Sequence, residues 1–518
     1  MPKRIPLHAL LLAAFPILQL TAHNVDQIDP RQALRPLLIA LIAAALALVV
    51  LTLVLRGREI AGVVLSLGLV LFFSYGQLYA LLKQEPLAGL VLGRHRYLVP
   101  VYAAALLLGL WAIRRSREHL AAATQGLNWI GAALLILPVV QIGSFLARQS
   151  AASETAAGFS SESLPAVSAE AAELPDIYYI ILDMHTRSDA LLKDLGFDNS
   201  AFVREMQEQG FYVAECARSN YEETLSSLTA ALNLDYLSQL RLQLAAEGLG
   251  ESEVRALMKN SLVRRSLESM GYRTVAFQTG YVWSEMTDAD VFLSLSSDPL
   301  LLQRLTPFES LLLETTAYKL WLDSRYRALI AQFGAEDFPY RDHVELQLYI
   351  LDQLPRIADI DGPTFTFAHV LIPHPPYVFA PDGEIRTDPG FFSGPQAGPV
   401  DEEYLREGYT GQVAFIDGRI SEIAAEIIRA SDPPPILIIQ GDHGLRGHNR
   451  LQILNMYYFP GVPNPGLYPS ITPVNSFRVL FNAYFGADLE LLPDRSFDEV
   501  DESIEVKEPE AACQAPPG

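Results

Sequence analysis

Two acidic residues and a histidine stand at the ends of apolar segments that lie far apart in the sequence. Asp183 follows the apolar run 177–182, while Asp442 and His443 follow the run 436–440 within a Gly-Asp-His-Gly motif. Parallel strands of an open α/β sheet end at one edge, which is where such folds bind ligands. Carboxylate and imidazole groups together suit zinc or manganese better than calcium. The pattern predicts a divalent metal site, although an Asp in such a position can also simply cap a turn or helix.

A hydroxyl-rich segment, Ser219–Leu228, leads into an apolar-periodic helix and places Thr224 near the helix N-terminus. Free backbone N–H groups and the helix dipole favour an anion there. A hydroxyl beside a divalent metal ion can lose its proton and become a nucleophile. Thr224 is therefore a candidate catalytic residue, or else an ordinary N-cap. Glu222 and Glu223 would repel an anionic substrate, so we expect them to point away from the site.

Histidines near these motifs could contact a phosphoryl oxygen or protonate a leaving group. His374 follows the strand-like run 364–371, in a loop at the same predicted sheet edge. His448 follows the Asp-His pair by a few residues, and Arg446 is a competing anion contact. His369 is internal to the strand-like run, so we expect it to be structural.

The first 150 residues differ from the remainder in hydropathy and charge. Half of the 518 residues are hydrophobic, and the excess lies in this first part. It carries 13 Lys and Arg against 5 Asp and Glu, whereas the remainder carries 25 against 55. One part therefore resembles a membrane domain and the other an acidic, water-soluble domain. Such acidity disfavours nucleic acid as a partner.

Four apolar runs reach the length that a bilayer requires, about 20 residues. They are Leu37–Leu55, Ile60–Leu82, Tyr97–Ile113 and Leu127–Leu146. A shorter fifth run, Ile5–Thr21, could be a first span or a secretory signal, and we favour an uncleaved span. Basic residues in the short loops favour an N-terminus inside, which places the C-terminal part outside. Few ionisable residues lie within the spans, which indicates an anchor or a platform for a lipid substrate rather than a transporter.

Beyond the spans, strand-like runs alternate with helical patterns. This alternation predicts a mostly parallel sheet sandwiched by helices. Residues 281–345 carry a weaker strand signal and are interpreted as an insertion or cap. We expect a transmembrane domain of about five helices, a flexible or loosely helical linker, an α/β domain and a disordered acidic tail. Their predicted bounds are 1–147, 148–175, 176–497 and 498–518.

The chain has two cysteines, Cys216 and Cys513. They could pair only with each other, and Cys513 lies in the predicted disordered tail. We therefore expect no disulfide framework.

In this order, the motifs resemble the alkaline-phosphatase superfamily in its sulfatase-like branch. Its most specific elements here are Thr-x-x-Ser-Leu from Thr224 and Asp-His-Gly from Asp442. Spans followed by an outer domain look like the lipid-A phosphoethanolamine transferases and the lipoteichoic acid synthases. The resemblance implies one metal ion bound by Asp183, Thr224, Asp442 and His443, with a phospho-threonine intermediate at Thr224. It also implies that His374 and His448 contact the phosphate of the substrate.

Two departures from the family disfavour a sulfatase. The segment from Cys216 does not fit Cys-x-Pro-x-Arg, and Asp183 is followed by Met184 rather than by a second aspartate. A further Asp-x-x-x-His pair is also missing, since Asp417 has Ser421 where the histidine would stand. One divalent metal ion, zinc or manganese, is therefore expected.

The resemblance implies a metal-dependent enzyme of a bacterial-type plasma (inner) membrane, with its soluble domain facing outward. It would transfer or hydrolyse a phosphate-ester group of a phospholipid or cell-envelope glycan through Thr224. A sulfate or phosphate ester hydrolase on the same site is one alternative. A non-catalytic domain that binds a lipid or a partner protein is another. The sequence leaves donor, acceptor and oligomeric state open.

Overall fold

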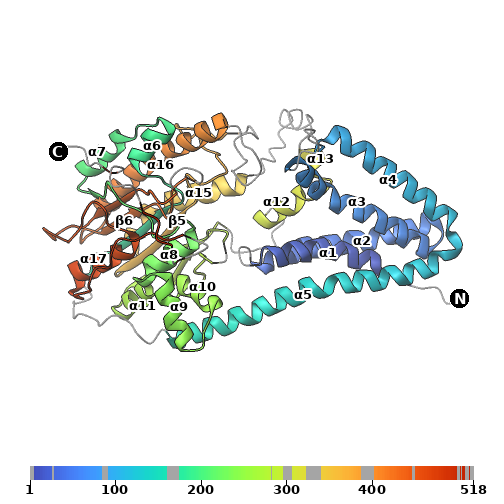
Figure 1. The fold of residues 1–518 in the computed structure, drawn as a ribbon, viewed down its shortest axis with the longest axis horizontal. Coiled ribbons are helices and arrows are strands. Elements are labelled where there is room, and N and C mark those ends of the chain that lie inside the picture. Colours follow the sequence, from blue (N-terminus) through green and yellow to red (C-terminus); the bar gives the residue numbers. More distant parts are fainter. Residues whose placement is uncertain are drawn as a thin grey trace. The chain divides into compact units, whose positions relative to one another are not determined.

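The computed structural model describes residues 5–25, 29–84, 92–159, 174–281, 283–295, 306–322, 340–386, 402–445, 450–498, 502, 504–507 and 513. The chain divides into two compact units. The first comprises Met1–Ala147 and Asp298–Asp342, and the second comprises Arg148–Ser297 and His343–Gly518. The first unit holds the long apolar helices and the second holds the sheet (Figure 1).

The apolar runs of the first unit form helices. These are α1 (His8–His23), η1 (Pro30–Ala33), α2 (Leu34–Leu55), α3 (Arg58–Gln84), α4 (His95–Arg115), η2 (Arg117–His119) and α5 (Leu120–Phe159). The helices α2 to α5 are long and apolar enough to cross a membrane, as predicted, while α1 is apolar but shorter. Because α1 packs against both α2 and α3, it is part of the helical bundle.

Helix α5 continues to Phe159. The first part of the predicted linker, 148–175, is therefore an extension of the last apolar helix. Its alanines and its Gln and Glu residues favour helix. The remainder of that linker up to residue 173 lies outside the described residues.

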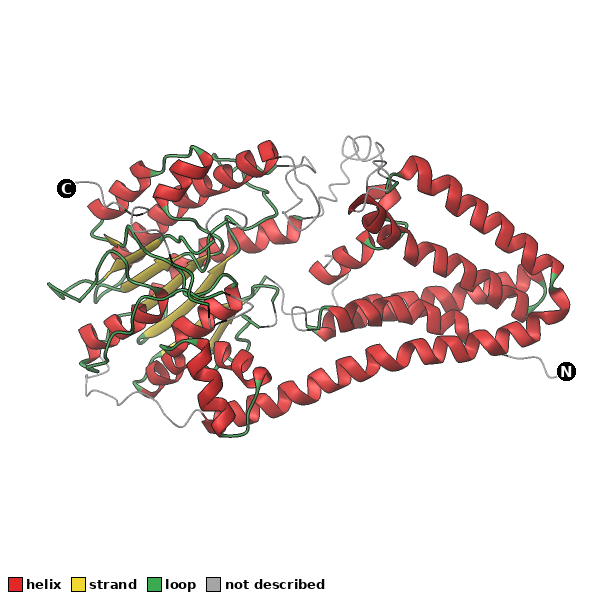
Figure 2. Cartoon of the chain, viewed as in Figure 1, coloured by secondary structure: helices red, strands yellow, loops and turns green. Residues whose placement is uncertain are grey.

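Among the described residues, the second unit contains a seven-stranded sheet in the order β2-β7-β6-β1-β5-β3-β4. Figure 2 shows its strands in yellow. Its strands are β1 (Ile177–Leu182), β2 (Tyr212–Val213), β3 (Arg273–Phe277), β4 (Val291–Leu293), β5 (Thr364–Val370), β6 (Ile436–Gln440) and β7 (Asn455–Tyr458). The neighbours from β6 to β4 pair in parallel, and β7 pairs antiparallel with both β6 and β2. The mostly parallel sheet predicted from the sequence is confirmed.

Helices cover both faces of this sheet, with α6, α7 and α16 on one side and α8, α11 and α17 on the other (Figure 1). The helices are α6 (Ser188–Leu195), α7 (Ser200–Glu208), α8 (Thr224–Asn233), α9 (Leu237–Ala246), α10 (Glu251–Lys259), α11 (Leu262–Ser269), α15 (Arg341–Gln353), η4 (Leu354–Asp359), α16 (Glu402–Ala430) and α17 (Pro473–Phe485). The first unit also holds α12 (Pro307–Glu314) and α13 (Lys319–Leu322).

Strand β1 is fully buried between β5 and β6. A strand covered on both faces is a near-continuous apolar run, as is this one. On one face, Tyr179 packs edge-to-face on Phe477 of α17, with 5.0 Å between ring centroids. This packing fixes the central strand that carries Asp183 at its end.

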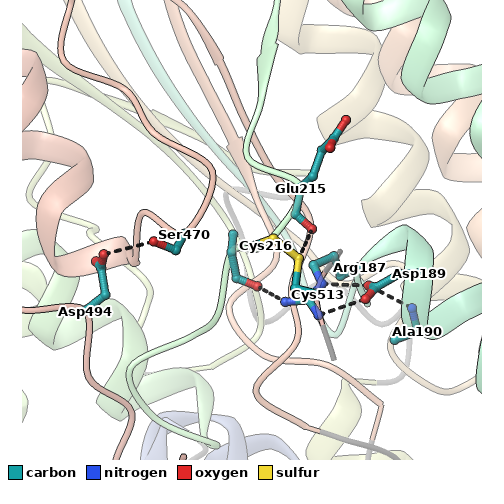
Figure 3. Close-up of a disulfide and its surroundings, with 9 residues drawn as sticks. Arg187, Asp189, Ala190, Glu215, Cys216, Ser470, Asp494 and Cys513 are labelled. Carbon is teal, nitrogen blue, oxygen red and sulfur yellow. Dashed lines mark hydrogen bonds and ion pairs between the residues drawn. A yellow bond between two sulfur atoms is a disulfide. The ribbon is translucent and has the colours of Figure 1, made fainter. Parts of the chain in front are cut away.

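A disulfide and a backbone hydrogen bond connect residues near the C-terminus to the rest of the second unit. Cys216 and Cys513 form a disulfide across 297 residues, with 5.7 Å between their Cα atoms (Figure 3). The Phe497 N–H donates to the Asn220 carbonyl (2.9 Å), in the segment that leads into α8. The sequence allowed this single pairing but did not predict it, because pairing over such a distance depends on the fold and leaves no local pattern.

Reducing the disulfide should lower the unfolding free energy by about 2–5 kcal/mol, because the link restricts the unfolded chain over a long loop. Thermal unfolding of the full chain in detergent, with and without reductant, measures this. Cys513→Ser should unfold at the lower temperature under both conditions. An oxidised wild type that unfolds together with the variant contradicts the prediction.

Candidate metal centre

Two neighbouring strands bring three of the predicted metal ligands to one edge of the sheet, and a third strand adds His369. Asp183 follows β1, and Asp442 and His443 follow β6 after Gly441. His369 is the penultimate residue of β5, in register with Ile181 of β1. Gly441 lies against the carbonyl group of His185, so a Cβ at this position would overlap it. The sharp exit from β6 therefore requires glycine.

The side chains converge in a buried cluster. Candidate ligand atoms of Asp183, His369 and Asp442 all lie within 4.8 Å of one another. The His443 Nε2 atom lies 3.8 Å from Asp183 Oδ1 and 3.6 Å from Asp442 Oδ2. The exposed fractions of Asp183 and Asp442 are 4% and 0%. The spatial convergence expected from the sequence is present for Asp183, Asp442 and His443.

The two carboxylates have oxygen atoms without hydrogen-bond partners among the described residues. Asp183 Oδ1 and Asp442 Oδ2 are both buried and unpartnered, whereas Asp442 Oδ1 accepts a hydrogen bond from the Met184 N–H (2.9 Å). Buried polar atoms are rarely left without a partner. The unpartnered oxygen atoms and the nearby imidazole form a donor set that fits zinc or manganese.

Hydrogen bonding sets the tautomer of His443. Its Nδ1 atom lies 2.9 Å from the Gly444 carbonyl oxygen, which can only accept, so Nδ1 carries the proton. In the neutral ring, Nε2 then presents a lone pair toward the two carboxylates. A ring nitrogen fixed in this way is the usual arrangement of a metal-binding histidine.

Asp183 is held in its ionised form. Burial raises the pKa of its carboxyl group, but the protonated forms of His374, His369 and His443 and the hydrogen bond from His369 together bring the pKa well below its usual range. His369 Nε2 lies 3.1 Å from Asp183 Oδ2. The carboxylate form is the one that binds a cation.

Thr224 is the first residue of α8, and its Oγ1 lies 3.3 Å from His443 Nε2. Since that nitrogen has the lone pair, the Thr224 hydroxyl donates to it. The first turn of α8 also presents backbone N–H groups without intrahelical partners. Thr224 therefore lies beside the carboxylates at a helix N-terminus, as the sequence predicted.

Two serines of the same motif connect α8 to the end of β6. Ser219 Oγ and Ser227 Oγ both contact the carbonyl oxygen of Asp442, at 2.6 and 2.8 Å. The sequence assigned these serines no role. They fix the distance between the helix that carries Thr224 and the strand that carries Asp442 and His443.

The remaining candidates have different outcomes. His374 donates from Nδ1 to the Pro375 carbonyl (2.7 Å), which leaves Nε2 available as an acceptor in the neutral ring. Arg446 and His448 lie outside the described residues. Glu223 receives a hydrogen bond from Arg450 (2.9 Å), so part of its charge is offset.

His369 is the residue that sequence reasoning missed. It does lie within a strand, as expected, but its ring contacts Asp183 and belongs to the cluster. Its ring also lies 5.8 Å from that of Trp283. Its position beside the end of the strand was the available signal, because a penultimate residue can still reach the edge of the sheet.

Asp417, which the sequence analysis considered for a second metal ion, has another partner. Its Oδ1 lies 2.7 Å from His185 Nε2, and its Oδ2 accepts from the Asn199 side chain (3.0 Å). Asp417 lies in α16, so its contact with His185 connects this helix to the loop after β1. Among the described residues, it is not part of the candidate metal cluster.

No protein-family model and no curated protein match the sequence. Solved structures do. The chain is similar to the C-terminal periplasmic domain of EcEptC from Escherichia coli in complex with zinc, with 12% identity and a TM-score of 0.43 over 66% of this chain and 96% of that one. It is also similar to the integral membrane protein lipooligosaccharide phosphoethanolamine transferase A from Neisseria meningitidis, with 11% identity and a TM-score of 0.38 over 91% and 92% of the two chains.

A third similar structure is BT1596, a 2-O GAG sulfatase, with 13% identity and a TM-score of 0.38 over 62% of this chain and 72% of that one.

Proposed function

We propose that the chain is a membrane-anchored, metal-dependent enzyme that transfers or hydrolyses a phosphate-ester group, with Thr224 as the nucleophile. The observation that carries this proposal is the contact between the Thr224 hydroxyl and His443 Nε2 at the edge of two buried carboxylates. A threonine that only caps a helix does not require a histidine and two buried carboxylates beside its hydroxyl group. The unpartnered oxygen atoms of Asp183 and Asp442 support a bound cation.

The cation would be zinc or manganese, held by Asp183, Asp442, His443 and the Thr224 hydroxyl. When bound, it would favour the deprotonated hydroxyl and offset charge on the phosphoryl oxygens. His369 holds Asp183 from the opposite side of its carboxylate. Helix α8 begins at Thr224 beside this cluster, so backbone N–H groups of its first turn would contact the phosphoryl group.

In the proposed step, the bond from the Thr224 oxygen to phosphorus forms while the bond from phosphorus to the leaving alcohol breaks. The Thr224 hydroxyl loses its proton to solvent, and the leaving oxygen takes up a proton, for which His374 in its protonated form and the undescribed His448 are candidates. A second alcohol, or water, then accepts the group from Thr224. The two outcomes correspond to a transferase and to a hydrolase.

The disulfide supports a location outside the cytoplasm. Disulfides persist in oxidising compartments and are rare in the cytosol. The bond between Cys216 and Cys513 therefore favours an outward-facing second unit on a plasma (inner) membrane, as the loop charges predicted. A phospholipid or cell-envelope glycan is the substrate class that such a location offers.

Mass spectrometry of the intact protein, after brief incubation with phospholipid vesicles, tests the proposal. A phosphate-ester adduct on Thr224 is expected, and its mass identifies the transferred group. Substrate turnover with an adduct on another residue would remove Thr224 from the mechanism. A protein that binds zinc and manganese but shows no turnover would favour a binding domain.

A further inference from the structure

The segment 306–322 belongs to the second unit by sequence but to the first unit by its contacts. It stands between β4 and α15, which are both parts of the second unit. Its helices α12 and α13 nevertheless group with residues 1–147. The sequence predicted an insertion or cap here, without indicating where it would pack.

Apolar side chains of α12 pack among the membrane helices. Phe308 and Leu312 are buried in one cluster with Ile17 of α1 and Ala33 of η1. Partly buried residues around this cluster are Leu20, Leu37, Ala40 and Phe73. The contacts therefore come from the last part of α1, the first part of α2 and the last part of α3. If α1 to α5 each cross the bilayer once, these parts lie on the same side, which is also the side where α5 ends.

An ion pair reinforces this packing. Arg35 of α2 donates to Glu309 through two nitrogen atoms, one of them Nε at 2.6 Å from Oε1. The side chains are 12% and 6% exposed. Glu309 also completes a capping box, because its Oε2 accepts from the Thr306 N–H (2.9 Å) and its own N–H donates to Thr306 Oγ1 (3.2 Å). Removing one partner would leave a buried charge uncompensated.

The backbone of the segment also bonds directly to α3. The Ala317 N–H donates to the Phe72 carbonyl (2.7 Å), and the Gln77 N–H donates to the Thr315 carbonyl (3.2 Å). This close approach occurs at Gly76, where a Cβ would lie 2.7 Å from the Thr315 oxygen and would also overlap the Glu314 carbonyl. Gly68 of the same helix has no such neighbour within 4 Å. The absence of a side chain at Gly76 therefore allows the backbone of the segment to lie directly against α3.

We propose that segment 306–322 is a docking element that holds the insertion of the second unit on the membrane helices, and that action on membrane-embedded substrates depends on it. The dependence on substrate rests on the proposed function. Besides α5, the chain connects the two units only at the two ends of the insertion. Docking raises the effective concentration of the catalytic unit at the bilayer, whereas a soluble substrate reaches the site by free diffusion.

The matched pair Gly76→Ala and Gly68→Ala tests this on the full-length protein. Both changes place alanine in α3 and raise its helix propensity, so a defect at position 76 alone reports the overlap. In vesicles of phosphatidylethanolamine and phosphatidylglycerol, Gly76→Ala should release lipid product at least about tenfold more slowly than wild type. A soluble chromogenic phosphodiester should be turned over at the wild-type rate. Gly68→Ala should match wild type on both.

Trypsin cleavage at Lys319, assigned by fragment mass, reports the docking without relying on turnover. Lys319 lies over the Tyr79 ring of α3 (5.3 Å), so a docked segment should be protected in wild type and Gly68→Ala but cleaved faster in Gly76→Ala. Glu309→Gln removes the charge, keeps the size and should also be cleaved faster at Lys319. It serves as the test variant if Gly76→Ala does not fold. Equal cleavage in all variants, or equal lipid turnover by Gly76→Ala and Gly68→Ala, overturns the proposal. A wild type that turns over neither substrate contradicts the proposed function instead, and the cleavage pattern still decides the docking.

Discussion

Thr224→Ala should lower kcat by at least about 10³-fold, because removing a nucleophile eliminates the step that the rest of the site supports. Metal content and the unfolding temperature should remain close to wild type, since the three other candidate ligands stay in place. Thr224→Ser keeps the hydroxyl and should retain part of the activity. The measurement is single-turnover kinetics with a chromogenic phosphodiester, together with metal analysis of the same samples.

Thr229→Ala is the matched control on the same helix. The Thr229 hydroxyl is buried and has no partner among the described residues, so its loss removes no contact with the cluster. This variant should keep wild-type kcat. If Thr224→Ala were as active as Thr229→Ala, the hydroxyl beside His443 would have no chemical role.

The positions of the core residues of the candidate site could be predicted from the sequence because these residues have local signals. Asp183 and Asp442 each end an apolar run of strand length, and parallel strands end at one edge. Thr224 precedes an apolar-periodic helix, and the structure begins α8 at this residue. In each case, element type and position along the element determine where the side chain lies.

Other features have no local signal. His369 contributes through the register of β5 beside β1, and register is a property of the assembled sheet. The disulfide joins residues separated by 297 positions. The docking of 306–322 depends on Gly76, which from the sequence is one glycine among several in an apolar helix. Only the capping box at Thr306 could have been read locally, and it predicts a helix without predicting its partner.

Asp442→Asn should abolish most of the stabilisation that a metal ion gives to the protein. Asp442 Oδ2 and Asp183 Oδ1 are buried without partners, so a cation between them would offset two negative charges at once. A metal ion at 1,000 times its Kd stabilises a protein by about 4 kcal/mol. Loss of a carboxylate ligand should weaken binding at least about 100-fold, since even changes behind the ligands cost about 10–100-fold. At the same metal concentration, about 1.4 kcal/mol would then remain.

Thermal unfolding with chelator, zinc or manganese measures this difference, and Asp417→Asn is the matched control. Asp417 is buried, as Asp442 is, but pairs with His185. Its replacement should lower the unfolding temperature with and without metal, because it breaks a buried pair, and should leave the metal-induced increase unchanged. The metal-free Asp442→Asn variant should not unfold at a lower temperature than wild type, because it loses a buried charge that has an unpartnered oxygen. Its metal-induced increase in unfolding temperature should be smaller than that of wild type. An undiminished metal-induced increase in Asp442→Asn would mean that the cation binds elsewhere.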